Sequence, residues 1–161
     1  MATTGAIVPL TPGRIWAGLP RAEAMAEASS QTFTLGAPVY LNASGMLQEI
    51  AQSALTVYGI AGQAGLNSAT DGVRNTRVYK ISPDALFEGT LSVASWNISL
   101  ATSVFGLSKS GSSWILVTAP TLSASAQCRV RGLANNVTFQ TGDTNPVVVF
   151  SFVNTYIQGE I

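Results

Sequence analysis

A strongly hydrophobic run lies near the C-terminal end of the chain, at residues 147–153 (VVVFSFV). This β-branched and aromatic run is interrupted by a single serine. It is too short to span a bilayer and is typical of a strand covered on both faces. A second pattern precedes it, in which Cys128 and Val130 alternate with Arg129 and Arg131. That alternation predicts a strand with one buried and one solvated face.

Residues 142–146 (GDTNP), between these two patterns, are dense in turn-forming types. Glycine supplies positive φ, Asp and Asn hydrogen-bond to their own backbone, and proline cannot donate to a strand ladder. The two hydrophobic patterns therefore predict neighbouring strands, joined by a long connection, that close a β-domain.

Short apolar or alternating runs recur along the rest of the chain, with turn-forming residues between them. This spacing predicts eight or nine short strands and is typical of a small, single-domain all-β sandwich or barrel. No fixed-period repeat and no alternation with long helices competes with that interpretation. The expected strands are residues 39–41, 46–47, 55–61, 77–81, 91–93, 103–107 and 114–117, with turns at 42–45 and 109–113, an exposed loop at 62–75 and one helical turn after Pro83.

The N-terminal segment departs from this pattern. Residues 1–20 combine apolar side chains with three prolines, which fit neither a helix nor a regular sheet. We expect an extended N-terminal arm that lies on its own domain or, preferably, on a neighbouring subunit. Residues 21–30 (RAEAMAEASS) have helical propensity but little to bury, so we expect a short helix or irregular lead, then a strand at 31–35. The chain thus divides into an arm and lead at 1–26 and a β-domain at 27–161.

Charge is sparse. Eight basic and eight acidic residues give a formal net charge of zero, and only 10% of the 161 residues are charged, against roughly 25% in ordinary soluble domains. Low charge with positive mean hydropathy disfavours a free monomer and is easier to understand if much of the surface is buried in an assembly. An ordinary secreted or coat-like β-domain is the alternative. Zero net charge gives no electrostatic footprint for nucleic acid or acidic membrane.

Candidate chemistry is scarce. The chain has no histidine, the commonest general base, and its single cysteine, Cys128, excludes an internal disulfide framework. Asp84 and Glu88 form the one close mid-chain carboxylate pair, and capping of a turn explains them better than glycosidase chemistry. Residues 142–145 lack the spaced acidic ligands of a calcium loop. We therefore expect no enzyme activity, no cofactor and no bound metal.

A further set of short stretches follows in order between about residues 27 and 153. They are 33–41 (FTLGAPVYL), 44–45 (SG), 58–61 (YGIA), 65–67 (GLN), 81–88 (ISPDALFE), 105–107 (FGL), Trp114, 129–131 (RVR), and 142–146 (GDTNP) with the hydrophobic run 147–152. In combination they resemble the head decoration proteins of tailed bacteriophages, also called cement or auxiliary capsid proteins. Residues 1–26 lie outside the resemblance.

The resemblance implies a small β-barrel or β-sandwich that binds the outside of the mature icosahedral head. Such proteins commonly sit as trimers at three-fold and quasi-three-fold positions, where they bridge neighbouring major capsid subunits. The expected partners are the major capsid protein and further copies of this chain, with no nucleic acid, membrane or small-molecule substrate. No signal-peptide pattern opens the sequence, so we expect synthesis in the host cytoplasm and a final location on the outer surface of the virion.

The arm carries the side chains that such an interface would use. We expect Ile7, Val8, Leu10, Ile15 and Trp16 to contact the capsid or an adjacent copy, since buried aliphatic and aromatic groups dominate interface energetics.

Two other functions stay open at this point. A phage tail or fibre β-domain that binds host glycan would need an exposed aromatic platform around Trp96 or Trp114. A minor coat protein that forms the shell itself fits least well, because the chain is short for a tailed-phage shell subunit.

Overall fold

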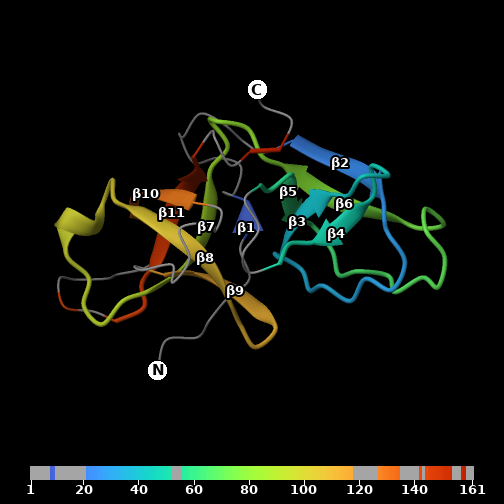
Figure 1. The fold of residues 1–161 in the computed structure, drawn as a ribbon. Helices are drawn as coiled ribbons and strands as arrows, with labels where there is room; N and C mark the ends of the chain where they lie inside the picture. Colours follow the sequence, from blue (N-terminus) through green and yellow to red (C-terminus); the bar gives the residue numbers. More distant parts are fainter. Residues whose placement is uncertain are drawn as a thin grey trace.

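The computed structural model describes residues 8–9, 21–51, 56–117, 127–134, 142, 144–153 and 157–158. Regular structure in these residues is almost entirely β and forms two sheets that lie side by side (Figure 1). Among them the helical element is a single 3-10 turn, η1 (Ile98–Leu100). The expectation of an all-β fold is therefore confirmed.

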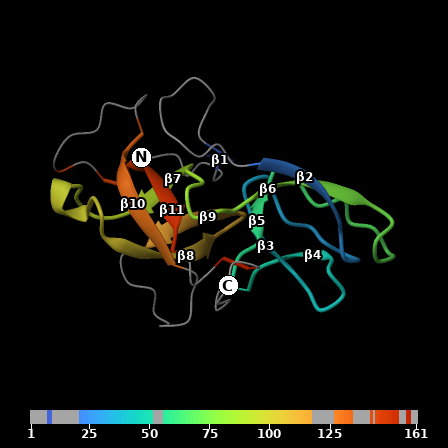
Figure 2. The same cartoon turned by 90° about the horizontal axis from the view of Figure 1, so that it is seen from above.

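One sheet curls into a closed ring. Its strands are β7 (Phe87–Ser92), β8 (Val104–Ser110), β9 (Ser113–Val117), β10 (Gln127–Leu133) and β11 (Val147–Phe152). They pair in the order β7-β11-β10-β8-β9, and a parallel pairing of β9 with β7, at Leu91 and Leu116, returns to the first strand. Closure leaves these five strands without a long open edge. Figure 2 shows this ring and the second sheet from above.

A short strand, β1 (Val8–Pro9), adds to the outside of the ring. It pairs antiparallel with the start of β7, where Val8 lies opposite Glu88. The other end of the same β7 edge pairs with β9, so β1 and β9 share that edge between them. The sequence pattern predicted no sheet in this proline-rich segment, and for these two residues that prediction is wrong.

The second sheet is built from the first half of the chain. It contains β2 (Arg21–Ala26), β3 (Pro38–Leu41), β4 (Leu47–Glu49), β5 (Gly59–Ala61) and β6 (Asn75–Lys80), in the antiparallel order β2-β6-β5-β3-β4. A parallel bridge between Glu27 and Leu47 brings β4 back to the end of β2. The N–H of Ala28 donates to the carbonyl of Leu47 at 3.0 Å beside that bridge. The second sheet is therefore also rolled toward closure.

Three local predictions from sequence are wrong. Residues 21–26 form strand β2 rather than a helix or irregular lead, because all six of them find register partners on β6. Residues 31–35 form a loop rather than a strand, with Phe33 buried in the core. The segment after Ser82 closes as a simple turn, in which the Ala85 N–H donates to the Ser82 carbonyl at 3.0 Å. For β2, pairing with β6 overrides the local helical propensity.

One hydrophobic core joins the two sheets. A single cluster of buried side chains includes Val39 and Ile60 from the second sheet and Leu91 and Leu116 from the ring. The hydrophobic run of β11 contributes most of the aromatic packing: Phe150 and Phe152 lie 5.6 Å apart between ring centroids and both contact Phe87. Five of the six β11 residues are buried, which confirms a strand covered on both faces.

Candidate interaction surfaces

The five arm residues predicted to contact a partner are largely beyond the part of the chain that the structure describes. Ile7, Leu10, Ile15 and Trp16 lie outside the described residues, and Val8 is described in its backbone, which pairs with β7 of the same chain. The contact itself stays a prediction.

A buried carboxylate holds the loop at residues 62–74. Glu27 is completely buried. Its oxygens accept the N–H of Leu66 at 2.9 and 3.0 Å and the N–H of Asn67 at 3.2 Å, and they also accept the hydroxyl of Thr76. A carboxylate is costly to bury unless hydrogen bonds replace its hydration. Here backbone and hydroxyl donors supply that replacement.

The backbone of Glu27 fixes the far end of the same loop. Its N–H donates to the carbonyl of Arg74 at 2.9 Å, and its carbonyl accepts the N–H of Gly72 at 2.9 Å. One residue therefore fixes the loop in its middle through the side chain and near its end through the main chain. Sequence patterns did not predict this role, because a glutamate among alanines suggests an exposed helical position.

Because Glu27 holds loop 62–74 in one conformation, the apolar side chains of the loop are exposed at fixed positions. Leu66, whose N–H is bonded to Glu27, leaves 47% of its surface exposed, and Val73 leaves 63% exposed. Asp71 is exposed and accepts the N–H of Ser29 at 2.6 Å, a hydrogen bond that lowers the pKa of this carboxyl. The expected exposed loop is thus confirmed, and it is an ordered one that could meet a partner without a large loss of conformational entropy.

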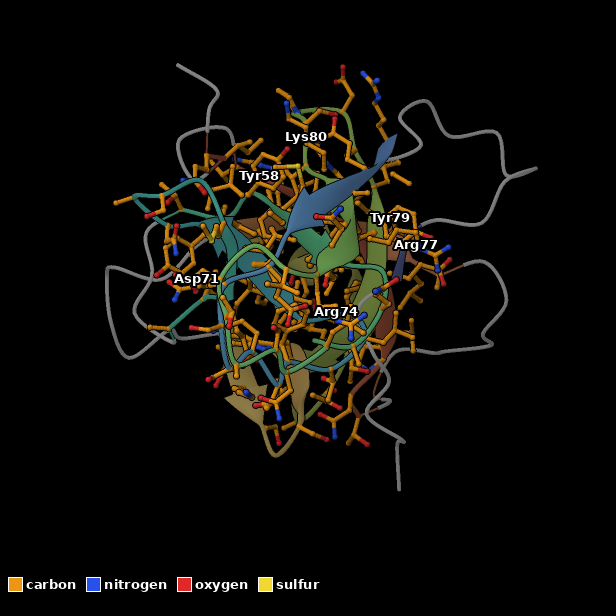
Figure 3. The ribbon with its side chains drawn as sticks, turned by 90° about the vertical axis from the view of Figure 1, so that its right-hand side faces the viewer. Tyr58, Asp71, Arg74, Arg77, Tyr79 and Lys80 are labelled. Carbon is orange, nitrogen blue, oxygen red and sulfur yellow. The ribbon has the colours of Figure 1, made fainter. Side chains whose placement is uncertain are left out.

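Beside the loop, strand β6 presents a basic and aromatic face. Arg77 and Tyr79 lie opposite Ala24 and Ala22 of β2. Arg77 is exposed, and Tyr79 is half-buried. The Arg77 guanidinium donates to the Gly62 carbonyl at 3.0 Å and lies 5.9 Å from the centroid of the Tyr79 ring. A Cβ on Gly62 would lie 2.9 Å from that ring, so a larger residue there would displace the pair. Figure 3 looks onto this end of the molecule and shows the two side chains next to each other.

A buried tyrosine, Tyr58, lies near the same sheet, above Arg77 and Tyr79 in Figure 3. The Tyr58 hydroxyl donates to a carboxylate oxygen of Glu23 at 2.7 Å, and Lys80 Nζ lies 5.7 Å from the centroid of the Tyr58 ring (Figure 3). Burial, and then the hydrogen bond and charge of Glu23, raise the pKa of Tyr58 to about 12. The phenol therefore stays protonated near neutral pH and ties β2 to the rest of its sheet.

We call the outer face of β2 and β6, together with loop 62–74, the β2–β6 surface. Strand β2 forms its border, since within the described ranges β2 pairs along one side only, with β6. The surface combines exposed apolar groups, an arginine–tyrosine pair and a strand edge. These are features of protein interfaces rather than of catalytic centres.

The candidate chemical residues are dispersed or buried. Cys128 is completely buried, and burial raises the pKa of its thiol well above the ordinary value. Asp84 is exposed on a turn, whereas Glu88 lies in β7. The described part of the chain holds no group of three or more His, Cys, Asp or Glu side chains arranged for a metal ion.

Both tryptophans considered for a glycan platform are internal. Trp96 and Trp114 are 3% and 2% exposed, and the indole N–H of Trp114 donates to Glu49 at 2.9 Å. Sugar-binding platforms need exposed aromatic faces, so these two residues do not form one.

Comparisons with known proteins add no family assignment. The chain matches no protein-family model, and no curated protein matches it. Among the residues that the structure describes, no helix has the length and apolar character to span a membrane.

Proposed function

We propose that this protein binds the exterior of a tailed-bacteriophage head and stabilises the capsid by bridging neighbouring major capsid subunits. In this proposal it acts as trimers at three-fold and quasi-three-fold sites, as a decoration protein. The ordered sequence resemblance between residues 27 and 153 motivates the assignment. The all-β fold supports it, because the resemblance implies a β-barrel or β-sandwich.

The observation that carries the proposal is the loop anchored by Glu27. A protein that reinforces a shell must bind repeated, fixed positions, and a surface ordered beforehand loses little free energy on docking. The buried carboxylate orders the loop that exposes Leu66 and Val73. We assign the β2–β6 surface to the capsid contact on this basis.

Bridging also requires a body that transmits force between its contacts. The shared hydrophobic core joins the ring to the second sheet. An ion pair reinforces that junction: Lys109 Nζ, on β8, lies 2.7 Å from the carboxylate of Glu49, on β4. A rigid body with several weak contacts gains from multivalency, since separating the capsomers then breaks the contacts together.

Co-sedimentation tests the proposal. Purified protein is mixed with undecorated heads, assembled from the major capsid protein encoded in the same genome, before and after shell expansion. We expect saturable binding to expanded heads, in numbers that match the three-fold and quasi-three-fold sites. Absence of binding to either form would refute the proposal.

A pair of variants tests the assigned surface. The double substitution Leu66→Ser with Val73→Ser removes exposed apolar groups from the loop and should weaken binding to heads. The control is Ile98→Ser, since Ile98 is 78% exposed. Its element, η1, lies at the opposite end of the ribbon from loop 62–74 (Figure 1). Equal binding by the loop variant and the control would place the contact elsewhere.

A further inference from the structure

A hollow of about 290 Å³ lies on the outside of the ring, away from the β2–β6 surface. It is lined by Arg129, Arg131, Ser151, Phe152 and Val153, from β10, β11 and the residue that follows β11. Its volume is at the low end for small-molecule sites, and it suits a single side chain.

Strand register gathers the polar groups of this hollow. Arg129 lies directly opposite Ser151 in the β10–β11 pair. A β-bulge follows at Arg131, because Val130 pairs with Phe150 while Gly132 already pairs with the next residue, Val149. Both arginines are exposed, and the bulge places Leu133 opposite the buried Val148. Bulges commonly redirect a side chain in this way.

The hydrogen bonds orient the two guanidinium groups without using all their donors. Arg131 Nε donates to the Ser151 hydroxyl at 3.0 Å, and Arg129 donates to the Thr102 carbonyl at 3.3 Å. A guanidinium has five N–H donors, and these bonds to described residues use one in each. Among the described residues that line the hollow, none is acidic. Ser151, the one polar residue of an otherwise apolar strand, thus holds an arginine in place.

We propose that this hollow binds a carboxylate carried on an aliphatic stem, supplied by an acidic side chain of a partner protein. Paired arginines match the planar geometry of a carboxylate. Val153, which is half-buried, provides an apolar side chain against which a methylene stem would pack. A nucleic acid would need a longer track of cations, and the chain has no net positive charge.

We assign the major capsid protein as the partner that supplies the carboxylate. This assignment rests on the proposed function, whereas the carboxylate site does not. The hollow lies on the ring, and the β2–β6 surface lies on the other sheet. One copy with both contacts would touch two capsid subunits at once, which is the arrangement that bridging requires.

The first experiment tests the site without heads. The side-chain Nε–H resonances of arginine are followed by NMR while the full-length protein is titrated with glutarate. We expect saturable shifts at Arg129 and Arg131, and none at the exposed Arg74, which serves as the internal control. Arg131→Gln should abolish the saturable shift at Arg129. Uniform, non-saturating shifts at every arginine, or tighter binding of inorganic phosphate than of glutarate, would overturn the carboxylate site.

The second experiment tests the partner. Arg131→Gln should weaken co-sedimentation with expanded heads by about tenfold, as expected for a lost charge-assisted contact, and Arg131→Lys should recover part of it because it keeps the charge. Unchanged binding of Arg131→Gln, with wild-type binding intact, would overturn the shell protein as the source of the carboxylate. Failure of the wild type to bind heads would instead count against the proposed function, while the glutarate titration would still decide the site.

Discussion

The backbone N–H of Leu66 donates to both carboxylate oxygens of Glu27, at 2.9 and 3.0 Å, across 39 positions of sequence. This contact makes the stability of the protein depend on a loop at its surface. Glu27→Ala would leave the N–H of Leu66 and the hydroxyl of Thr76 without this acceptor, whereas the N–H of Asn67 would keep its hydrogen bond to the Gln31 carbonyl at 3.1 Å. We expect a loss of roughly 3–5 kcal/mol in the free energy of unfolding, measured by urea denaturation.

Two comparison variants separate the parts of this anchor. Thr76→Val removes one donor and keeps the carboxylate bonded to the backbone, so we expect a loss of about 1–2 kcal/mol. Asp84→Asn alters an exposed carboxyl on a turn and should change stability by less than about 0.5 kcal/mol. If Glu27→Ala lowered the free energy of unfolding no more than Asp84→Asn, the hydrogen bonds of Glu27 would not stabilise the fold.

Ionisation of Tyr58 should lower stability at high pH. Its pKa is raised to about 12, above the value of about 10 in an unfolded chain. The folded state therefore holds this proton more tightly, and the stabilisation is complete below pH 10 and is lost as the pH rises to 12. Ultraviolet difference titration should show a late ionisation that is lost in Tyr58→Phe.

The same titration separates the causes of that shift. Glu23→Gln removes the charge beside the Tyr58 hydroxyl, so the pKa of Tyr58 should fall. It should stay above its ordinary value, because burial is the largest cause. Glu49→Gln alters a carboxyl that bonds Lys109 and Trp114 and should leave the titration unchanged. A pKa for Tyr58 that does not respond to Glu23→Gln would contradict the assigned hydrogen bond.

Glu49 should contribute more through Trp114 than through Lys109. The indole N–H of the buried Trp114 and the ammonium group of Lys109 both donate to the same carboxylate oxygen. Lys109→Ala removes a partly exposed ion pair and should cost about 0.5 kcal/mol. Glu49→Ala also leaves a buried indole N–H without its acceptor and should cost about 2 kcal/mol. Tryptophan fluorescence during unfolding measures both; equal losses would show that the ion pair dominates.

Glycine is required at position 59 for space rather than for backbone conformation. A Cβ there would lie 2.4 Å from a Val78 methyl carbon and 2.7 Å from the Tyr79 carbonyl oxygen. We expect Gly59→Ala to cost about 2–3 kcal/mol. The matched control is Gly45→Ala, which has open space around its Cβ but a φ of +75°, and which should cost about 1 kcal/mol. Thermal unfolding distinguishes them, and the reverse order would disprove the crowding.

The arm prediction is best tested without removing β1, whose pairing covers part of the β7 edge. The double substitution Ile15→Ser with Trp16→Ser should leave urea stability unchanged and weaken binding to expanded heads. Ile98→Ser again serves as the control for loss of an exposed apolar side chain. Full binding by the double variant would remove the arm from the interface.

The strands that could be predicted from sequence are those in which the pattern of apolar and polar residues matches their burial in the fold. The alternation at Cys128 and Val130 against Arg129 and Arg131 survives in β10 because one face meets the core. The run in β11 is buried on both faces as its composition suggests. Strand β2 escaped prediction because alanine and glutamate favour a helix locally, whereas six partners on β6 decide the outcome.

The candidate surfaces could not be predicted from sequence for a different reason, namely that they depend on contacts between distant residues. Glu27 and Leu66 meet across a long loop, and no spacing rule connects them. Ser151 looked like an interruption of an apolar strand until the register placed it opposite Arg129 and in contact with Arg131. Contacts of this kind depend on strand order, which local propensity does not contain.

The closed ring sets an order in which the protein can assemble during synthesis. All five strands of the second sheet lie within residues 21–80, and so do Glu27 and its hydrogen-bond partners. The ring, in contrast, is joined by β11, which lies between β7 and β10 and is the last of its strands along the chain. The strands that pair within the second sheet are therefore all synthesised before the ring is complete, whereas pairing of the ring must wait until residue 152 has left the exit tunnel. The core that the two sheets share is completed only when the ring closes.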